Sequence, residues 1–553
     1  MIKINKKTSK KITFLLFFTL FLTGLFTFKD YGISIDEEFH RSSGFYWLNY
    51  ILNFTSFDDF KNLVSIKINQ IHGFTLPLPE TYPYYGVVFD LPIAFLEVLF
   101  QINDPKNYFY FKHLLNFILF FISSVFFYKL LLNRFINYNI ALIGTLFFIL
   151  SPRIYGNSFF NNKDLVFLSL VTITLYYCFK SLDKLSYKNL LIFSTLAALC
   201  TAHRVLGFFI PISFFIFFLL SVLSNTKNLK NLPNITFFFI FYFLFLILFW
   251  PLLWVDPFEN FSLAFNYFSA IPLTIKMLFD GSYVGTDLLP YNYIFIWVLI
   301  TTPLLYVIFF LIGYVQLFKR FFLKFLNVKE KNFYSDLWRG SKEKKDLFIL
   351  FNITSIIVYF VSFNVSLYTG WRQIYFLNIF IIYISIYAFY RIDLKIKSLS
   401  KTKAHFGIVI LYLLFVAYKM ISYHPYQNIY FNSMFNNDAH KKFEVDYWGL
   451  SGRKFLEEIL ILEKNKKIIT IGVASWLPLE RSVKLLDKKD RSRIKIIGQE
   501  FQNADYLYTN FISEVDKNSN DKYKIPSNFS KINEFILDNM TVYEVFKKDD
   551  PIN

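Results

Sequence analysis

Long apolar runs recur along this chain, and most have the length that a membrane-spanning helix requires. The first runs from Ile12 to Phe28 and follows five lysines. Ten further runs comprise residues 113–131, 138–151, 165–180, 189–202, 205–222, 235–253, 292–317, 347–363, 374–390 and 405–421. About 20 helical residues cross the roughly 30 Å hydrocarbon core of a bilayer. The chain is 55% hydrophobic, which is too apolar for an ordinary soluble protein. We predict an α-helical polytopic membrane protein with about eleven transmembrane helices.

The distribution of basic residues predicts the orientation of these helices. Lysine and arginine cluster in alternate connections, most densely in residues 318–346 and 391–404. Cytoplasmic loops carry this excess, so the amino terminus is expected in the cytoplasm. Nucleic acid is excluded as a partner because the net charge of +18 is explained by topology. The composition indicates a bacterial inner membrane as the location, with the bilayer as the main partner.

Residues 29–111 form a long predicted outer segment. Residues 45–54 and 57–71 are amphipathic and predict juxtamembrane helices. The apolar run 87–100 is interrupted by acidic residues and proline, which favours an interfacial or re-entrant segment. Treating that run as a full span would invert the downstream topology, and the charge distribution argues against this alternative.

The carboxyl-terminal tail, residues 422–553, is more polar than the rest, and the odd number of predicted spans places it on the extracytoplasmic side, in the periplasm or outside the cell. It contains β-like runs and one helical pattern, at residues 467–474, 493–498, 504–509 and 541–546 and at residues 451–462. We expect a small α/β domain here, attached to a transmembrane domain of residues 1–421.

Ionisable residues gather near the outer membrane face in four separate loops. They are Asp36, Glu37, Glu38, His40 and Arg41 in the first loop, Arg153, Lys163 and Asp164 in the second, His203 and Arg204 between two spans, and Arg372 farther on. Each has a structural explanation, such as helix capping for Asp36 or Asp164, contact with lipid phosphates for Arg153 or Lys163, and anchoring at the membrane interface for Arg372. Together they favour a site, because ionisable groups at membrane depth face cavities or one another.

Carboxylates among cations at this level suit group transfer from a lipid phosphate. Cations would bind the phosphate and stabilise it as it leaves. A carboxylate would deprotonate the acceptor, or would hold a divalent metal that activates it. Sequence signatures of nucleotide-hydrolysing P-loops, zinc proteases and α/β-hydrolases are absent from the chain.

The order of these motifs resembles the GT-C glycosyltransferase superfamily. The segments are IDEEFHR after the first span, SPRIYGNSFFNNKD before the fourth, and then HRVLG, TTPLL and GWRQIYF. They are similar to the family 39-like group, which includes protein O-mannosyltransferases and lipid A aminoarabinose transferases. The resemblance covers about residues 10–420 and implies a polyprenyl-phosphate-linked sugar donor. It also implies transfer on the extracytoplasmic side to a lipid, glycan or protein acceptor.

The resemblance also implies roles for individual residues. Asp36 corresponds to the catalytic acid, with Glu37 as its neighbour. The expected donor-phosphate site comprises Arg153, Lys163, Asp164, Arg204 and Arg372. Glu38, His40 and His203 are further site candidates, and Asp36, Glu38 and His40 are a candidate site for Mg²⁺ or Mn²⁺.

Two other functions fit the same sequence features. A transporter or flippase of lipid-linked sugars would use the same cations, although it would favour symmetric halves that are not apparent here. A non-catalytic envelope assembly protein whose carboxyl-terminal domain binds a partner would explain the tail. The concentration of charge at the outer face favours the enzyme.

Overall fold

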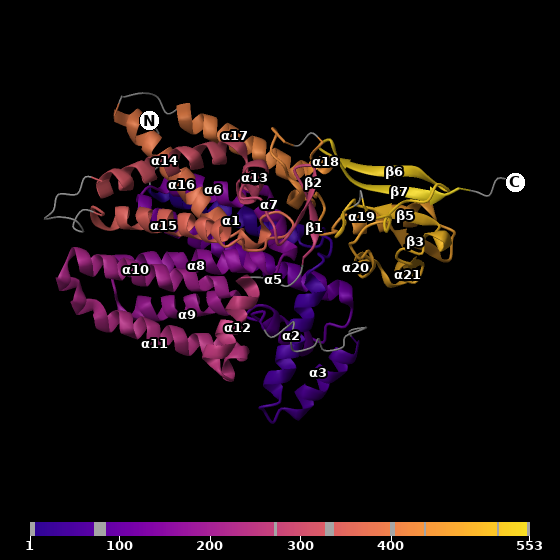
Figure 1. The fold of residues 1–553 in the computed structure, drawn as a ribbon, viewed down its shortest axis with the longest axis horizontal. Coiled ribbons are helices and arrows are strands. Elements are labelled where there is room, and N and C mark those ends of the chain that lie inside the picture. Colours follow the sequence, from indigo (N-terminus) through magenta and orange to yellow (C-terminus); the bar gives the residue numbers. More distant parts are fainter. Residues whose placement is uncertain are drawn as a thin grey trace.

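The protein is a bundle of long helices that carries a small β-sheet at one end (Figure 1). The computed structural model describes residues 6–70, 84–269, 274–326, 337–398, 404–435, 438–516 and 519–549. Within these ranges, eight helical segments are long and apolar enough to cross a membrane. They are α1 (Lys6–Thr27), α5 (Pro105–Phe135), α8 (Asp164–Asp183), η1 (Val205–Phe208) with α10 (Phe209–Ser224), η2 (Thr226–Asn231) with α11 (Leu232–Phe249), α14 (Leu304–Leu326), α15 (Gly340–Ser362) and α17 (Ala404–Ser422). The chain is thus a helical, membrane-type protein.

The remaining predicted spans are also helical but are shorter or less apolar. They correspond to α6 (Tyr138–Ile149), α9 (Tyr187–His203) and α16 (Leu377–Ser398), and α13 (Tyr293–Thr301) precedes α14 where a single span was expected. Pro303 separates α13 from α14, since proline lacks the N–H that a continuous helix requires. The predicted number of eleven spans stays a prediction.

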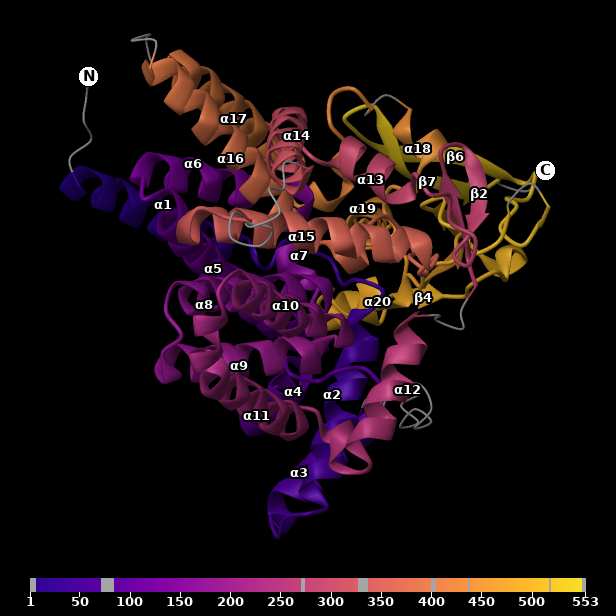
Figure 2. The ribbon, with the colours of Figure 1, turned by 60° about the vertical axis from the view of Figure 1, so that its left-hand side comes forward.

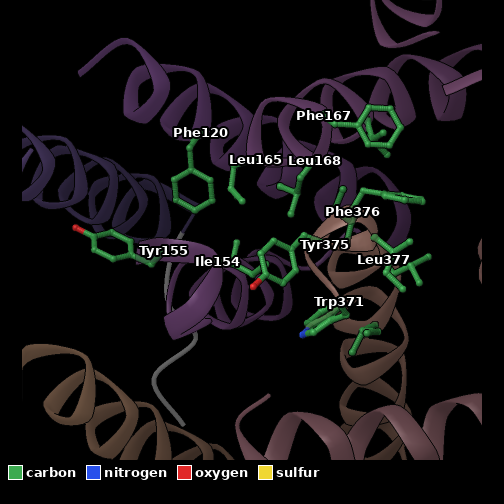
Figure 3. Packing of buried hydrophobic residues seen from close by; sticks show 14 of the residues in the cluster. Phe120, Ile154, Tyr155, Leu165, Phe167, Leu168, Trp371, Tyr375, Phe376 and Leu377 are labelled. Atoms are coloured by element: carbon green, nitrogen blue, oxygen red, sulfur yellow. The ribbon is translucent and has the colours of Figure 1, made fainter. Parts of the chain in front are cut away.

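The second outer loop is partly helical. Residues Pro152–Phe160 form α7, which begins with proline at its first turn and bends by 62° from α6. All nine residues of α7 are buried. Apolar side chains of α5, α7, α8 and the segment just before α16 pack together here, among them Phe120, Ile154, Leu165 and Phe376 (Figure 3). This packing places the polar end of the loop at a defined position.

The first outer segment contains the expected amphipathic helices. They are α2 (Glu37–Leu52), α3 (Asp58–Gln70) and α4 (Asp90–Leu99), the last lying where an interfacial or re-entrant segment was predicted. Helices α2 and α4 approach closely at Gly44, where a Cβ atom would lie 2.5 Å from the carbonyl oxygen of Asp90. The connection between α11 and α13 forms α12 (Pro257–Ser269) and the hairpin β1 (Lys276–Phe279) and β2 (Ser282–Gly285), which the sequence patterns did not predict.

The tail forms a five-stranded mixed sheet in the order β4-β3-β5-β7-β6. Its elements are α19 (Gly452–Leu462), β3 (Ile469–Val473), β4 (Ile494–Ile496), β5 (Tyr506–Thr509), β6 (Phe529–Leu537) and β7 (Met540–Lys548). Strands β3, β4 and β5 are parallel, whereas β5, β7 and β6 pair antiparallel. The four predicted strands and the predicted helix are present. Strand β6 escaped prediction because it is an edge strand whose side chains are mostly exposed.

Ion pairs and hydrogen bonds hold the sheet-bearing tail against the first outer segment. Arg453 donates to the Lys29 carbonyl oxygen at 2.6 Å, and Arg491 pairs with Asp104 at 2.7 Å. The backbone N–H of Ile35 donates to the Trp448 carbonyl oxygen at 3.2 Å. In the rotated view, α2 and α20 (Glu480–Val483) again lie near one another (Figure 2). The tail therefore packs against the segment that contains Asp36.

The buried carboxyl group of Asp446 should make the free energy of unfolding depend on pH. Its carboxylate accepts hydrogen bonds from the backbone N–H groups of Leu450 at 3.1 Å and Ser451 at 3.0 Å. Burial nevertheless raises its pKa from 3.8 to about 6. The folded state then binds the proton more tightly than the unfolded state does, so this contribution to stability is complete below pH 3.8 and is lost as pH rises through about 6.

We expect the free energy of unfolding to fall as pH rises from about 4 to 6, by at most about 1.4 kcal/mol per unit from this group. Asp446→Asn removes that contribution and flattens the profile. Thermal unfolding of the full chain across this pH range measures the difference. Equal slopes in the two proteins would contradict the assignment.

Candidate functional site

A cavity of about 400 Å³ lies where one end of the helix bundle meets the tail. Its lining comes from the start of α2, the start of α8, the α9–α10 junction, α12, the segment before α16, and the tail. Its ionisable residues are Asp36, His40, Lys163, Asp164, Arg204, Arg372 and Arg481. Six of these were site candidates by sequence, and the structure places them around one space.

Asp36 immediately precedes α2 and faces a buried arginine. Its Oδ2 accepts a hydrogen bond from Nη1 of Arg372 at 2.6 Å. The Asp36 side chain is 37% exposed, whereas that of Arg372 is 9% exposed. The guanidinium carbon of Arg372 also lies 4.6 Å from the ring centroid of Trp448. Burial opposes the charge of Arg372, but Asp36 and Asp164 outweigh it and raise the pKa of Arg372. The pair therefore offers an accessible carboxylate beside a fixed cation.

A second acid–base pair lies across the cavity at the start of α8. Asp164 accepts from Arg204 and also from the Asn161 amide at 3.0 Å. Arg204 in turn donates to the Gln373 carbonyl oxygen at 2.9 Å. Asp164 lies in the first turn of α8, where the helix dipole favours negative charge. Asp164 thus orients the guanidinium of Arg204, and Arg204 lines the cavity as a cation.

Lys163 is buried at the edge of the same space. Its Nζ donates to the Gly86 carbonyl oxygen at 3.0 Å, and its own carbonyl oxygen lies 2.9 Å from Nε2 of His203. Burial lowers the pKa of Lys163 to about 7. Physiological pH is therefore close to the pH at which the Lys163 ammonium group loses its proton.

Behind the cavity wall, His40 faces the buried Asp90. The Nδ1 atom of His40 lies 4.0 Å from Oδ2 of Asp90, and neither atom has a hydrogen-bond partner. Burial raises the pKa of Asp90 to about 6, and burial also lowers the pKa of His40 well below its usual value. Asp90 was visible in the sequence only as an acid interrupting an apolar run.

Several predicted site residues lie away from the cavity. The Glu37 carboxylate is fully buried, accepts from the Ser34 N–H at 2.6 Å and lies 3.0 Å from Nε2 of His113. Arg153 donates to the Tyr430 carbonyl oxygen at 2.8 Å and stacks over Phe431. Glu37 therefore holds α2 in place, and Arg153 holds the segment after α17.

Glu38 also points away, toward the tail. Its carboxylate pairs with Lys484, and its Oε2 lies 3.5 Å from Nε of Arg481. Among the residues that the structure describes, no three His, Cys, Asp or Glu side chains are grouped to hold a metal ion. Use of Mg²⁺ or Mn²⁺ at Asp36, Glu38 and His40 stays a prediction.

Two lining residues from the tail were missed by sequence reasoning. Trp476 and Arg481 reach the cavity, and Arg481 also donates to the Ile35 carbonyl oxygen beside Asp36. Both lie more than fifty residues beyond the last span, so no local pattern could have assigned them. The tail is therefore part of the cavity wall.

The fold and the site together define a helical membrane protein with a mostly apolar cavity at one end, into which several basic side chains and two carboxylates reach. No protein family model matches the sequence, and no curated protein does.

Proposed function

We propose that the protein is a membrane glycosyltransferase of the GT-C type, which moves a sugar from a polyprenyl-phosphate donor to an acceptor on the extracytoplasmic side. The observation that carries this proposal is the single cavity shared by Asp36, Lys163, Arg204 and Arg372. It combines a solvent-reachable carboxylate with three cations, which are the parts that transfer from a lipid phosphate requires. The resemblance of the outer-loop motifs to the family 39-like group supports the same conclusion.

In this proposal Asp36 accepts the proton of the acceptor hydroxyl. The acceptor oxygen attacks the anomeric carbon, the bond from that carbon to the phosphate oxygen breaks, and polyprenyl phosphate leaves. Arg372 and Arg204 would bind the phosphate and stabilise the charge that develops on it. Arg372 already contacts Asp36 at 2.6 Å, so the base and the leaving group would be held side by side.

The rest of the cavity wall suits the lipid portion of such a donor. From α12 it is lined by Phe265 and Phe268, and from the segment just before β1 by Ile275. Phe360 lines it from the end of α15. Apolar walls with a few charged groups at one side fit an isoprenoid chain with a phosphate end. The outer part of the cavity, bounded by Trp476 and Arg481, would then receive the acceptor.

The charge of Lys163 predicts how donor binding depends on pH. Its pKa is about 7, so the ammonium form prevails below that pH and the neutral amine above it. If Lys163 contacts the donor phosphate, the dissociation constant of the donor should rise as pH increases through 7, by up to about tenfold. Lys163→Arg keeps the charge and should flatten the profile, because arginine stays protonated throughout. Donor binding measured at several pH values tests this, and identical profiles would contradict the contact.

The function itself is tested with purified full-length protein in detergent and radiolabelled polyprenyl-phosphate hexoses and pentoses. Loss of label from the lipid, in the presence of membrane extract as acceptor source, is the expected result. A parallel reaction with chelator separates a metal-assisted reaction from direct base catalysis. Saturable donor binding without consumption of any donor would overturn the proposal and favour a flippase or an assembly protein.

A further inference from the structure

A second cavity lies at the end of the bundle opposite the sheet. Its volume is about 380 Å³, and it is bounded by the end of α8, the end of α10, the start of α11 and the start of α15. Figure 1 shows the α10–α11 connection and the β-strands at opposite ends of the molecule. By the predicted topology, this cavity opens at the cytoplasmic membrane face. It shares no lining residue with the cavity around Asp36.

The charge of this second cavity is positive. Asp183 is its acidic lining residue, and its carboxylate is already engaged by Lys345 at 2.7 Å, by Asn133 at 3.1 Å and by the Ser341 hydroxyl. Two lysines on the wall, Lys184 and Lys344, form no ion pair with any carboxylate in the described part of the chain.

The Nζ atom of Lys344 lies 5.3 Å from the ring centroid of Trp338, which holds this side chain at the cavity. Asn231 adds amide donors to the same wall. The wall therefore offers two cations that form no ion pair and a neutral donor, a set that suits an anionic oxygen group.

The surroundings of the cavity are those of a lipid-facing surface. Phe214, Phe218 and Ile235 form its apolar walls. Leu219 and Leu223, on the same helix as the two phenylalanines, are 43% and 55% exposed and would contact acyl chains. A basic pocket between the ends of transmembrane helices, flanked by such surfaces, is a recurring form of anionic lipid site.

We propose that this cavity binds the phosphate-bearing headgroup of an anionic phospholipid. Lys184 and Lys344 contact the phosphate, Asn231 donates to the remaining headgroup oxygens, and the acyl chains lie along Leu219 and Leu223. The volume falls within the range of pockets that hold small ligands, about 300–1,000 Å³. This site is independent of the proposed transferase activity, because none of its residues lines the outer cavity.

The experiment uses the full-length protein in a neutral detergent with added phosphatidylglycerol or phosphatidylcholine. Native mass spectrometry measures lipid retained by the folded protein, and thermal unfolding measures stabilisation. Wild type should retain phosphatidylglycerol in preference to phosphatidylcholine. Lys184→Gln with Lys344→Gln should weaken phosphatidylglycerol binding by about tenfold or more, since two charge-assisted contacts are lost.

A matched control removes the same charge at the same end of the bundle. Lys188 and Lys227 are exposed and lie outside the cavity lining, so Lys188→Gln with Lys227→Gln should leave the preference unchanged. Equal loss in both double variants would overturn the proposal, because it would reveal a general effect of charge.

A third arm adds inorganic phosphate in place of lipid. Stabilisation by phosphate equal to that by phosphatidylglycerol would assign the cavity to a soluble phosphate compound and would overturn the lipid assignment. Wild-type stability of the cavity variant in phosphatidylcholine shows that its folding is intact. A cavity variant that has lost that stability is replaced in the comparison by Lys184→Gln alone, whose side chain is exposed.

Discussion

Replacement of Asp36 by Asn should abolish sugar transfer while leaving the protein folded. The amide keeps the size of the carboxylate and can still accept the hydrogen bond from Arg372, which measures 2.6 Å. It cannot take up the proton of an acceptor hydroxyl, and loss of a general base typically lowers the rate by about 10²–10⁴-fold. The measurement is the initial rate of label transfer from a polyprenyl-phosphate sugar, at saturating donor.

Asp104→Asn is the matched control for this substitution. Asp104 is also an acid of the first outer segment and also pairs with an arginine, Arg491, at 2.7 Å. It lies outside the cavity lining and should leave the transfer rate near that of wild type. Transfer by Asp36→Asn at the rate of the Asp104→Asn control would rule out Asp36 as the base, even if the protein proved to be a transferase.

Removal of Arg134 should produce a large loss of stability without involving the outer cavity. The Nε of Arg134 donates to Oδ1 of Asp346 at 2.7 Å, and its Nη2 contacts the second carboxylate oxygen. Tyr383 also donates to this carboxylate, at 2.8 Å. All three groups are buried between α5, α15 and α16, so Arg134→Leu would leave a buried carboxylate without its paired cation. The expected loss is about 3–5 kcal/mol in the free energy of unfolding.

The double variant Arg134→Leu with Asp346→Leu should recover most of that loss, because both buried charges are then gone. An exposed pair provides the comparison: Lys441 and Asp438 lie 2.9 Å apart with side chains 65% and 64% exposed. Lys441→Leu should cost less than about 1 kcal/mol. Thermal unfolding in detergent compares the variants. If Arg134→Leu proved as stable as the double variant, the Asp346 carboxylate would not destabilise the protein when its cation is removed, and the prediction would be wrong.

Part of the fold could be predicted because the driving pattern is local. An apolar run long enough for a bilayer is visible without any knowledge of its neighbours, and every predicted span coincides with helical structure. The bend at Pro152 and the break at Pro303 shortened two of these helices. The edge strand β6 and the β1–β2 hairpin were missed because their partners, and not their own patterns, stabilise them.

The sequence predicted which types of residue form the candidate site, but it identified only some of the residues that line it. Asp36 and Glu37 are adjacent in sequence, yet one faces the cavity and the other faces His113. Successive residues of a helix point about 100° apart, so adjacency at the start of α2 separates the two carboxylates. Arg153 does not line the cavity either, because it lies in α7, whose nine residues are all buried.

By itself, the sequence determined that this chain is a helical membrane protein, and it predicted that basic loops lie on one side of the membrane and the site residues on the other. Those properties follow from hydrophobicity and charge, which are summed along the chain and need no three-dimensional information. Only the tertiary structure decided which ionisable groups share a space. Arg372 meets Asp36 across more than three hundred residues, and Trp476 and Arg481 complete the wall from the tail. Such contacts depend on how helices and sheet pack against one another, and the sequence of a single segment does not specify its neighbours in space.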